Sequence, residues 1–414
     1  MTSDSAAAPT STPEDHLIPL DEPAEGTPKV FTTHAELTHT VRLLQAGSGP
    51  LAIDAERASG FRYGQRNYLV QVRREGAGTF LIDPVALPDL SEISALGEHD
   101  EWVFHAAVQD LPSLHEQNIF PSRIFDTELG SRILGLERVG LGFVVAELLG
   151  YRLAKEHSAQ DWSTRPLPTE WLKYAALDVE LLIPLRHTLA EKLEDAGKLQ
   201  WALQEFEAVR TKDFSPKYKD PWRRVSGLHM LKNKRELAIA RELWVARDRL
   251  ARHRDVSPSR VLPDRAIIAA AKAKPKTIGE LSHLHAFGGP SNRRRAAQWQ
   301  KAIDNALSLP ADELPELRLP KKDAPPAPKV WAERDPQAAR RLEKAKLYYE
   351  QLSSELSIPI ENLLTPDTLR KVCWQPPRIV TASHIGDHLV SLGARPWQVE
   401  LAATQLARIF NESS

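Results

Sequence analysis

The sequence predicts an α/β domain followed by two small all-α units. Three observations support this fold class: strand-like and helix-like patterns alternate from residue 51 to about residue 192, strand signals fade beyond Pro221, and a Pro-rich charged segment separates two helical regions. A chain of 414 residues is also too long for one compact core. The predicted units are a disordered tail at 1–28, the α/β domain at 29–210, a helical domain at 211–308, an extended linker at 309–329 and a second helical domain at 330–414.

The N-terminal tail, residues 1–28, is rich in Ala, Pro, Ser and Thr, a composition that predicts disorder. It lacks the apolar core of a signal peptide, and no run in the chain approaches the ~18 apolar residues of a membrane span. The single cysteine, Cys373, excludes a disulfide framework and a Cys-based zinc site, and we expect it to fill a core. We therefore expect a cytoplasmic protein that does not bind a membrane.

The α/β domain is expected to contain a mixed sheet. Runs at 51–57, 67–73 and 79–83 are short and alternating and are separated by Gly-containing turns, which predicts a three-stranded antiparallel meander. Strand candidates at 102–105 and 123–125 are each followed by a helical period, which predicts parallel strands joined by helical crossovers.

Helical patterns dominate the rest of the chain. Thr169 is the predicted N-cap of a helix with an apolar side, and Pro184 is expected to kink or interrupt it. A long amphipathic helix is predicted at 232–254, and a last helical region from about 336 to 411.

The two helical domains resemble each other weakly. "VSPSRVL" at 256–262 recurs as "SIPIENLL" at 357–364, each after a long helix, and "IGEL" at 278–281 recurs as "IGDHL" at 385–389. The pattern favours a duplicated small helical module with a period of about 100 residues. Chance similarity between two helical bundles is the alternative.

Charge is distributed unevenly although the net charge is only −1. Residues 211–301 contain 22 Lys+Arg and 8 Asp+Glu, a balance of +14, so the remainder carries −15. This asymmetry favours a polyanionic partner for the helical domain. An ordinary solvated helical surface is the alternative.

Two acidic side chains share one face of the first predicted strand. Because strand side chains alternate, Asp54 and Glu56 project together, whereas Leu51, Ile53 and Ala55 face the other way. Adjacent like charges raise the cost of ionisation, so the pattern favours cations or water on that face. A plain solvent-facing strand is the alternative.

Further acidic residues follow the later elements. Asp110 lies on the first turns of the helix that follows the 102–105 strand, and Asp178 follows Tyr174 by four residues, which places both on one helical face. Asp126, at the head of the next helix, is expected to be an N-cap rather than a metal ligand.

Together these acids form an all-oxygen set that suits Mg²⁺ or Mn²⁺ and not zinc. Four carboxylates carry a charge of about −4, which matches two divalent ions, and a pair of such ions ~3.5–4 Å apart can activate water and stabilise the leaving oxygen of a phosphodiester. The candidate set is Asp54, Glu56, Asp110 and Asp178.

These motifs resemble the ribonuclease D family, in the DEDDy branch of 3′–5′ exonucleases with a ribonuclease H-like fold. The resemblance rests on "DAE" at 54–56, "FHAAVQD" ending at Asp110, and "DWSTRPLPTEWLKYAALD" at 161–178, and covers about residues 30–193. The segment "RELWVARDRLARHRDVSPSRVLPDRAI" resembles the HRDC domain that follows the exonuclease in this family, and "PWRRVSGL" its usual entry. The C-terminal region resembles the second HRDC-like module more weakly.

The resemblance implies roles for the matching residues. The four carboxylates would bind two Mg²⁺ or Mn²⁺ ions, and Tyr174 would orient the attacking water. A phenol with an ordinary pKa near 10 is a poor base at neutral pH, so we favour positioning over proton removal. Ala55 stands where the family usually has another spacer, and this change is expected to be harmless. Arg57 replaces a more usual apolar residue and puts the end of that strand in doubt.

Weaker candidates could contact nucleic acid. Aromatic rings can stack on bases, and basic clusters add salt-dependent affinity. Each group has an alternative role. His105 could be a hydrogen-bonded core residue, and the loop residues Phe61, Arg62 and Tyr63 could serve ordinary packing. The basic clusters could be a solvated surface. The candidates are Phe61, Arg62, Tyr63, His105, Arg165, Lys272, Lys274, Lys276, Arg293, Arg294 and Arg295.

The sequence therefore predicts a metal-dependent 3′–5′ exoribonuclease, expected to be a monomer, that releases nucleoside 5′-monophosphates from single-stranded RNA 3′ ends such as those of tRNA precursors. Two alternatives remain open. One is a DNA-directed exonuclease of the same branch, and the other is a nucleic-acid-binding protein with an inactive exonuclease fold.

Overall fold

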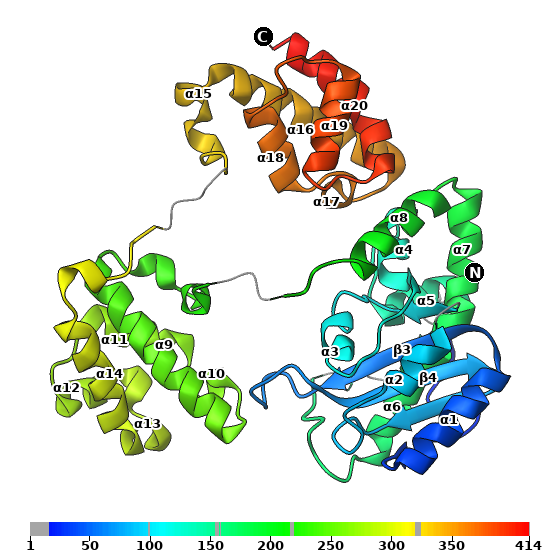
Figure 1. The fold of residues 1–414 in the computed structure, drawn as a ribbon, viewed down its shortest axis with the longest axis horizontal. Coiled ribbons are helices and arrows are strands. Elements are labelled where there is room, and N and C mark those ends of the chain that lie inside the picture. Colours follow the sequence, from blue (N-terminus) through cyan, green and yellow to red (C-terminus); the bar gives the residue numbers. More distant parts are fainter. Residues whose placement is uncertain are drawn as a thin grey trace, which may run out of the picture.

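The computed structural model describes residues 16–97, 100–153, 157, 159–215, 219–318 and 324–413. Figure 1 shows an α/β unit followed by two helical units, which confirms the predicted fold class. The α/β unit consists of β1 (Ile18–Leu20), β2 (Val30–Phe31), α1 (His34–Ala46), β3 (Ser48–Arg57), β4 (Asn67–Glu75), β5 (Gly78–Ile82), α2 (Ser91–Ser94), β6 (Glu101–Phe104), α3 (Leu111–His115), β7 (Arg123–Asp126), α4 (Thr127–Leu134), α5 (Leu141–Leu149), β8 (Tyr151–Leu153), α6 (Thr169–Glu180), α7 (Leu182–Asp195) and α8 (Leu199–Arg210).

The main sheet has six strands in the order β2-β5-β4-β3-β6-β7. Strand β3 pairs antiparallel with β4, and β4 pairs antiparallel with β5, which confirms the meander. On its other side β3 pairs parallel with β6, and β6 pairs parallel with β7, as the crossover pattern predicts. Strand β3 therefore lies inside the sheet, where neighbours on both sides hold its backbone in place.

The two faces of β3 pack against different helices. Ile53 and Ala55 belong to the large core that also contains residues of α1, whereas Ala52 packs with Val179 and Leu182 at the α6–α7 junction. Since side chains alternate along a strand, Asp54 and Glu56 share the Ala52 face and approach α6.

The helix is interrupted close to Pro184, as predicted. Helix α6 ends at Glu180, and α7 begins at Leu182 with Pro184 in its first turn, where the missing N–H removes no helical hydrogen bond. Thr169 is not the N-cap, as was expected, but the first residue of the helix. The N-cap position is occupied by Pro168, which makes no side-chain capping hydrogen bond.

The prediction of disorder through residue 28 is wrong for the part of the tail that the structure describes. Strand β1 pairs parallel with β8, and the Leu20 side chain packs against the hydrophobic cluster beside it. Downstream, Glu22 forms an ion pair with Lys173 of α6 at 2.5 Å. The prediction of disorder relied on the composition of residues 1–28. It could not include strand β8, which pairs with β1 and lies more than a hundred residues later in the sequence. Residues 1–15 lie outside the described residues.

The two helical units share an order of elements. Helices α9 and α16 each have 21 residues and end at a left-handed residue, Asp255 at φ 48° and Ser357 at φ 53°, before a four-residue helix. This common order supports the duplicated module. The first unit contains α9 (Lys234–Arg254), α10 (Pro258–Val261), α11 (Asp264–Ala273), α12 (Ile278–His283), α13 (Pro290–Arg294) and α14 (Ala296–Ser308); the second contains α15 (Trp331–Arg334), α16 (Pro336–Leu356), α17 (Ile360–Leu363), α18 (Pro366–Trp374), α19 (Ala382–Ser391) and α20 (Pro396–Asn411).

The predicted linker is only partly separate from the helical units. Leu309 and Leu314 pack against the core of the first unit, and the Glu316 carboxylate lies 2.5 Å from Lys234 Nζ. Residues 319–323 lie outside the described residues. Cys373 is buried in the second unit, as expected of a core cysteine.

The loop after β3 contacts the first helical unit. The Tyr63 hydroxyl donates to Asp248 Oδ1 at 2.8 Å, and the Ser257 backbone N–H donates to the Phe61 carbonyl at 2.9 Å. The Arg260 guanidinium lies 4.2 Å from the centroid of the Phe61 ring. The helical unit therefore holds the segment that directly follows strand β3.

The second helical unit contacts α8. Glu205, almost fully buried, accepts two hydrogen bonds from the Arg395 guanidinium, at 2.6 and 2.5 Å, and one from Trp397 Nε1 at 2.8 Å. The indole of Trp397 stacks on Trp201 with ring centroids 5.1 Å apart. One carboxylate thus satisfies two side chains of the other unit.

Replacing Glu205 is expected to weaken this contact strongly. The Glu205→Ala change leaves the Arg395 charge and the Trp397 N–H without their acceptor in a buried contact, so we expect a loss of about 3 kcal/mol in the free energy of unfolding. Urea denaturation followed by tryptophan fluorescence measures it. Glu207→Ala, on the exposed side of the same helix, breaks a pair with nearby Arg210; it is the matched control and should cost less than about 1 kcal/mol. Equal losses in the two variants would contradict the role of the buried carboxylate.

Candidate active site

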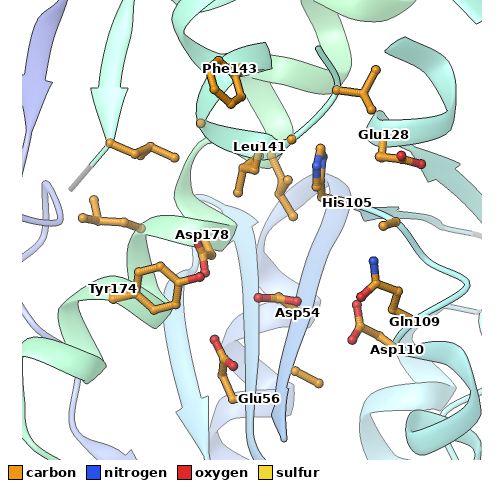
Figure 2. A pocket seen from close by; sticks show the side chains of 18 of the residues that line it. Asp54, Glu56, His105, Gln109, Asp110, Glu128, Leu141, Phe143, Tyr174 and Asp178 are labelled. Carbon is orange, nitrogen blue, oxygen red and sulfur yellow. The ribbon is translucent and has the colours of Figure 1, made fainter. Parts of the chain in front are cut away.

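The predicted acidic residues line one cavity of about 1010 Å³ in the α/β unit. Figure 2 shows Asp54 in the middle of the cavity wall, with Glu56, Tyr174 and Asp178 on one side and Asp110 on the other. The structure therefore brings together the four predicted metal ligands and Tyr174, from three separate segments of the chain.

Three of the carboxylates form a compact group. Asp54, Glu56 and Asp178 each offer an oxygen, and these oxygens lie within 4.8 Å of one another. Asp110 stands outside this group, across Asp54 (Figure 2). Such a set of hard oxygen donors fits a divalent ion of the Mg²⁺ or Mn²⁺ type in the compact group.

Regular secondary structure places the compact group. Alternation along β3 directs Asp54 and Glu56 to the same side, and the four-residue spacing in α6 puts Tyr174 and Asp178 on the helical face that meets them. Since β3 is an inner strand and α6 packs on the sheet, each ligand position is held by backbone hydrogen bonds of a rigid element.

Asp110 is positioned by a turn that Asp126 stabilises. The Asp126 carboxylate caps α4 by accepting from two backbone N–H groups of that helix, as predicted, and also accepts from the Ala106 and Ala107 N–H groups at 3.0 and 2.8 Å. These last two bonds hold the turn between β6 and α3, with Ala106 at a positive φ of 64°. Burial raises the pKa of Asp126 to about 6.

Burial and mutual repulsion make the carboxylates costly to ionise. Burial is the largest cause that raises the pKa of Glu56 well above its usual value, followed by the charges of Asp54, Asp178 and Asp110. The pKa of Asp110 is likewise raised well above its usual value by burial and by Asp54, and burial raises the pKa of Asp54. A cation in the cavity would relieve this cost, which is the electrostatic condition for a metal site.

Tyr174 remains protonated in these surroundings. Burial and the nearby carboxylates, Asp178 first among them, raise the pKa of its hydroxyl above the usual value of 10, and the hydroxyl is hydrogen-bonded to Asp178. The phenol is therefore suited to hold a hydrogen-bonded molecule in place and not to remove a proton.

Arg57, which the sequence left unexplained, lies in the same cavity. Its Nη1 is 3.3 Å from Asp110 Oδ1 and donates to the Gln109 carbonyl. Its charge opposes the rise in the pKa of Asp54, Glu56 and Asp110. The end of β3 is thus part of the acidic site.

Among the weaker candidates, Arg165 is engaged by partners within the protein. Its guanidinium donates to both Asp83 carboxylate oxygens, at 2.8 and 2.9 Å, and to the carbonyls of Trp162, Thr164 and Tyr68. With every guanidinium nitrogen engaged by protein acceptors, this side chain organises the loop before α6.

The loop candidates after β3 also have protein partners. Phe61 and Tyr63 contact the first helical unit, as described above, and Arg62 Nε donates to Ser163 Oγ at 2.7 Å. His105 lines the cavity, and its Nδ1 lies 2.9 Å from Thr127 Oγ1, in line with the hydrogen-bonded alternative. Burial lowers the pKa of His105 to about 4, so it is neutral at physiological pH. A nucleic-acid contact by these residues stays a prediction.

The basic clusters of the first helical unit are mostly at its surface. Lys274 is half-buried and pairs with Glu236 at 3.2 Å, and Arg295 donates to Ser291. The other members are exposed and remain candidates for nucleic-acid contacts: Lys272, Lys276, Arg293 and Arg294.

Sequence reasoning missed part of the cavity wall. Leu141 and Phe143, at the start of α5, line the cavity, and Phe143 is 54% exposed (Figure 2). Leu17, from the segment predicted to be disordered, lines it as well. The sequence around Phe143, "LGFVVAELL", is apolar at most positions, so no local signal distinguishes this exposed ring from the buried residues beside it.

Comparison with family models gives three matches along the chain. Residues 28–194 match a model described as 3′–5′ exonuclease, residues 236–303 one described as HRDC domain, and residues 324–410 one described as 3′ to 5′ exonuclease C-terminal domain. The second helical unit thus matches a different model from the first.

Curated relatives match over most of the chain. It is 30% identical over 300 residues to ribonuclease D of Escherichia coli strain K12, covering 70% of this chain and 77% of that protein. It is 32% identical over 276 residues to ribonuclease D of Shewanella strain ANA-3, covering 65% and 70%.

Two solved structures are similar along nearly the whole chain. A protein from Bifidobacterium adolescentis has 36% identity and a TM-score of 0.86, covering 95% of this chain and 100% of that one. Escherichia coli RNase D, described as an exoribonuclease involved in structured RNA processing, has 25% identity and a TM-score of 0.66, covering 93% and 99%.

The raised pKa values predict that the metal-free protein loses stability as pH rises. Glu56 and Asp110 contribute stability fully below their ordinary pKa values of 4.5 and 3.8, and this stability is lost as pH rises through the raised folded-state values. We therefore expect the melting temperature of the chelator-treated protein to fall as pH rises above the ordinary pKa values of these two groups. Differential scanning fluorimetry over a series of pH values measures it.

The Glu56→Gln variant is the control for this pH dependence, because its amide cannot ionise. We expect a smaller fall in its melting temperature, and we expect saturating Mn²⁺ to reduce the fall in the unsubstituted protein. If chelator-treated protein and Glu56→Gln show the same profile, Glu56 does not have the raised pKa.

Proposed function

From the premise that the chain belongs to the ribonuclease D family, we propose that it is a metal-dependent 3′–5′ exoribonuclease that releases nucleoside 5′-monophosphates. The observation that carries the proposal is the convergence of Asp54, Glu56 and Asp178 within 4.8 Å in a cavity that also contains Tyr174 and Asp110. We assign catalysis to residues 29–210 and the holding of RNA to the helical domains at 211–308 and 330–414.

The four carboxylates would hold two divalent ions at different places. Asp54, Glu56 and Asp178 fit one ion as a compact group, and a second would lie between Asp54 and Asp110. Bound there, Mg²⁺ or Mn²⁺ lowers the pKa of a water molecule and neutralises charge that develops on a phosphodiester.

Tyr174 positions the attacking water in this proposal. Because its hydroxyl stays protonated beside three carboxylates, it serves as a hydrogen-bond partner of fixed geometry. Asp178, four residues later on the same helical face, orients the hydroxyl.

The substrate is assigned to single-stranded RNA 3′ ends, tRNA precursors among them. Support comes from the similarity to Escherichia coli RNase D, an exoribonuclease involved in structured RNA processing, and from the charge balance of +14 in residues 211–301, obtained from 22 Lys+Arg and 8 Asp+Glu. A monomer is the simplest form, since one chain supplies all the site residues. Within the described residues, no helix is both long and apolar enough to cross a membrane.

Removing a carboxylate of the compact group is expected to abolish hydrolysis. Asp54→Asn and Asp178→Asn each take away a charged oxygen ligand, so we expect activity to fall by at least about 10³-fold. The assay follows release of a labelled 3′-terminal nucleotide from single-stranded RNA in Mg²⁺ or Mn²⁺. The product should be a nucleoside 5′-monophosphate.

Two comparisons make this test specific. Glu75→Gln, at the far end of β4, removes an exposed carboxylate from the same sheet and should retain full activity. A DNA strand of the same sequence tests the preference for RNA, and faster digestion of DNA would favour a DNA-directed enzyme. Full activity of both Asp variants would refute the proposed site. If the unsubstituted protein is inactive in both metals, the result favours the alternative of a nucleic-acid-binding protein with an inactive exonuclease fold.

The Tyr174→Phe change tests the positioning role separately from metal binding. It removes one hydroxyl and keeps the ring that packs beside Trp162, so the fold and Mn²⁺ binding should be unchanged. We expect kcat to fall by about 10²-fold, the lower range for a lost positioned group, with little change in KM. If Mn²⁺ affinity falls by the same factor as kcat, Tyr174 affects metal binding, and the proposal that it only positions the attacking water is contradicted.

A further inference from the structure

The Arg57 side chain contacts Asp110, one of the four carboxylates of the site. Its Nη1 lies 3.3 Å from Asp110 Oδ1, and the same group donates to the Gln109 carbonyl. The Arg57 side chain is 20% exposed and that of Asp110 7% exposed, so water screens this pair only partly.

An irregularity in the sheet accounts for the direction of this side chain. Strict alternation would place Arg57 on the face opposite Glu56, but the pairing of β3 with β4 shifts register between these two residues: Glu56 lies opposite Leu69, and Arg57 lies opposite Asn67. Such a shift re-aims the side chain that follows it. The fold therefore builds the contact, because a regular strand would turn Arg57 away.

The contact occupies the side of the cavity where Asp110 faces Asp54. Asp110 stands outside the compact group of three carboxylates, so an ion that used Asp110 as a ligand would have to replace the guanidinium at Asp110 or share the carboxylate with it. A guanidinium keeps its positive charge at physiological pH, so it competes with the ion under all ordinary conditions.

We propose that Arg57 is a built-in counter-cation that holds Asp110 in the metal-free enzyme and competes for this carboxylate with a second divalent ion that Asp54 and Asp110 would hold. This inference rests on the proposed function and adds an order of binding to it. Asp54, Glu56 and Asp178 would hold the first ion, and Arg57 would weaken the binding of the second ion because its guanidinium competes for Asp110 and repels a cation.

Calorimetric titration of chelator-stripped protein with Mn²⁺ tests the proposal. We expect the unsubstituted protein to bind one ion tightly and a second at least about tenfold more weakly, and Arg57→Gln to strengthen the second ion by about tenfold while changing the first by less than about threefold. Metal-free Arg57→Gln should also melt at a lower temperature than the unsubstituted protein, and saturating Mn²⁺ should remove that difference.

Arg132→Gln is the matched control. Arg132 lines the same cavity but pairs with Glu128 on its own helix at 2.5 Å, so its replacement removes an equal charge without freeing Asp110. We expect the second ion to bind this variant within about threefold of the unsubstituted protein. Should Arg57→Gln fail to fold, Arg57→Met, which keeps the aliphatic stem, gives the same comparison.

Three results would overturn the role of Arg57: equal second-ion affinity in the unsubstituted protein and Arg57→Gln, weaker second-ion binding in Arg57→Gln, or an equal gain in Arg132→Gln. Each of these leaves the proposed function intact, provided that Mn²⁺ binds and RNA is hydrolysed. Absence of Mn²⁺ binding and of hydrolysis in every protein would instead refute the proposed function and this inference with it.

Discussion

Repulsion among carboxylates in a largely buried cavity is the constraint on which the site depends. Asp54, Glu56 and Asp178 would separate if they lay on mobile loops, because burial and like charges both oppose their ionised forms. They stay together because an inner strand and a packed helix carry them, and the backbone of each is hydrogen-bonded along its length. The Asp126 carboxylate stabilises the turn before α3, because it accepts hydrogen bonds both from backbone N–H groups of that turn and from those at the start of α4. Stability of the scaffold is therefore what keeps an unfavourable arrangement of charges in place.

The two helical units are attached to this scaffold by contacts of different kinds. The second unit meets α8 through a buried carboxylate, an arginine and a pair of stacked indoles, a contact that is costly to expose. The first unit meets the loop after β3 mainly through hydrogen bonds and ion pairs of partly exposed side chains, such as Tyr63 with Asp248. Polar contacts between units separate more readily than buried ones, so the first unit is the easier of the two to displace. Since that loop directly follows Glu56 and Arg57, such a displacement acts on the end of the strand that carries the site.

The sequence was informative where the signal is local. Alternation identified the shared face of Asp54 and Glu56, and helical spacing identified the shared face of Tyr174 and Asp178, because both follow from the geometry of a single element. The contact of Arg57 was not predicted because its direction depends on a register shift against β4, and the pairing of Arg165 was not predicted because its acceptor, Asp83, lies 82 residues away. The ordered segment at 16–28 was missed for the same reason: the partner strand of β1 is β8. Pairings between segments that are distant in the sequence determine these features, and local composition and periodicity do not predict such pairings.

The distribution of charge, and not its sum, determines how a polyanion meets this molecule. The total of −1 combines a basic stretch, residues 211–301 with 22 Lys+Arg against 8 Asp+Glu, with an acidic remainder that contains the four carboxylates. At physiological salt the screening length is about 8 Å, so a phosphate near the basic stretch responds to that stretch and hardly to the distant acids. A phosphate that enters the cavity meets an excess of negative charge, because five carboxylate side chains line the cavity against three arginines, one of which is Arg57. Cations other than the protein's own are therefore required before this cavity can accept a phosphodiester, and the acidic residues that repel the substrate are the ones that would recruit those cations.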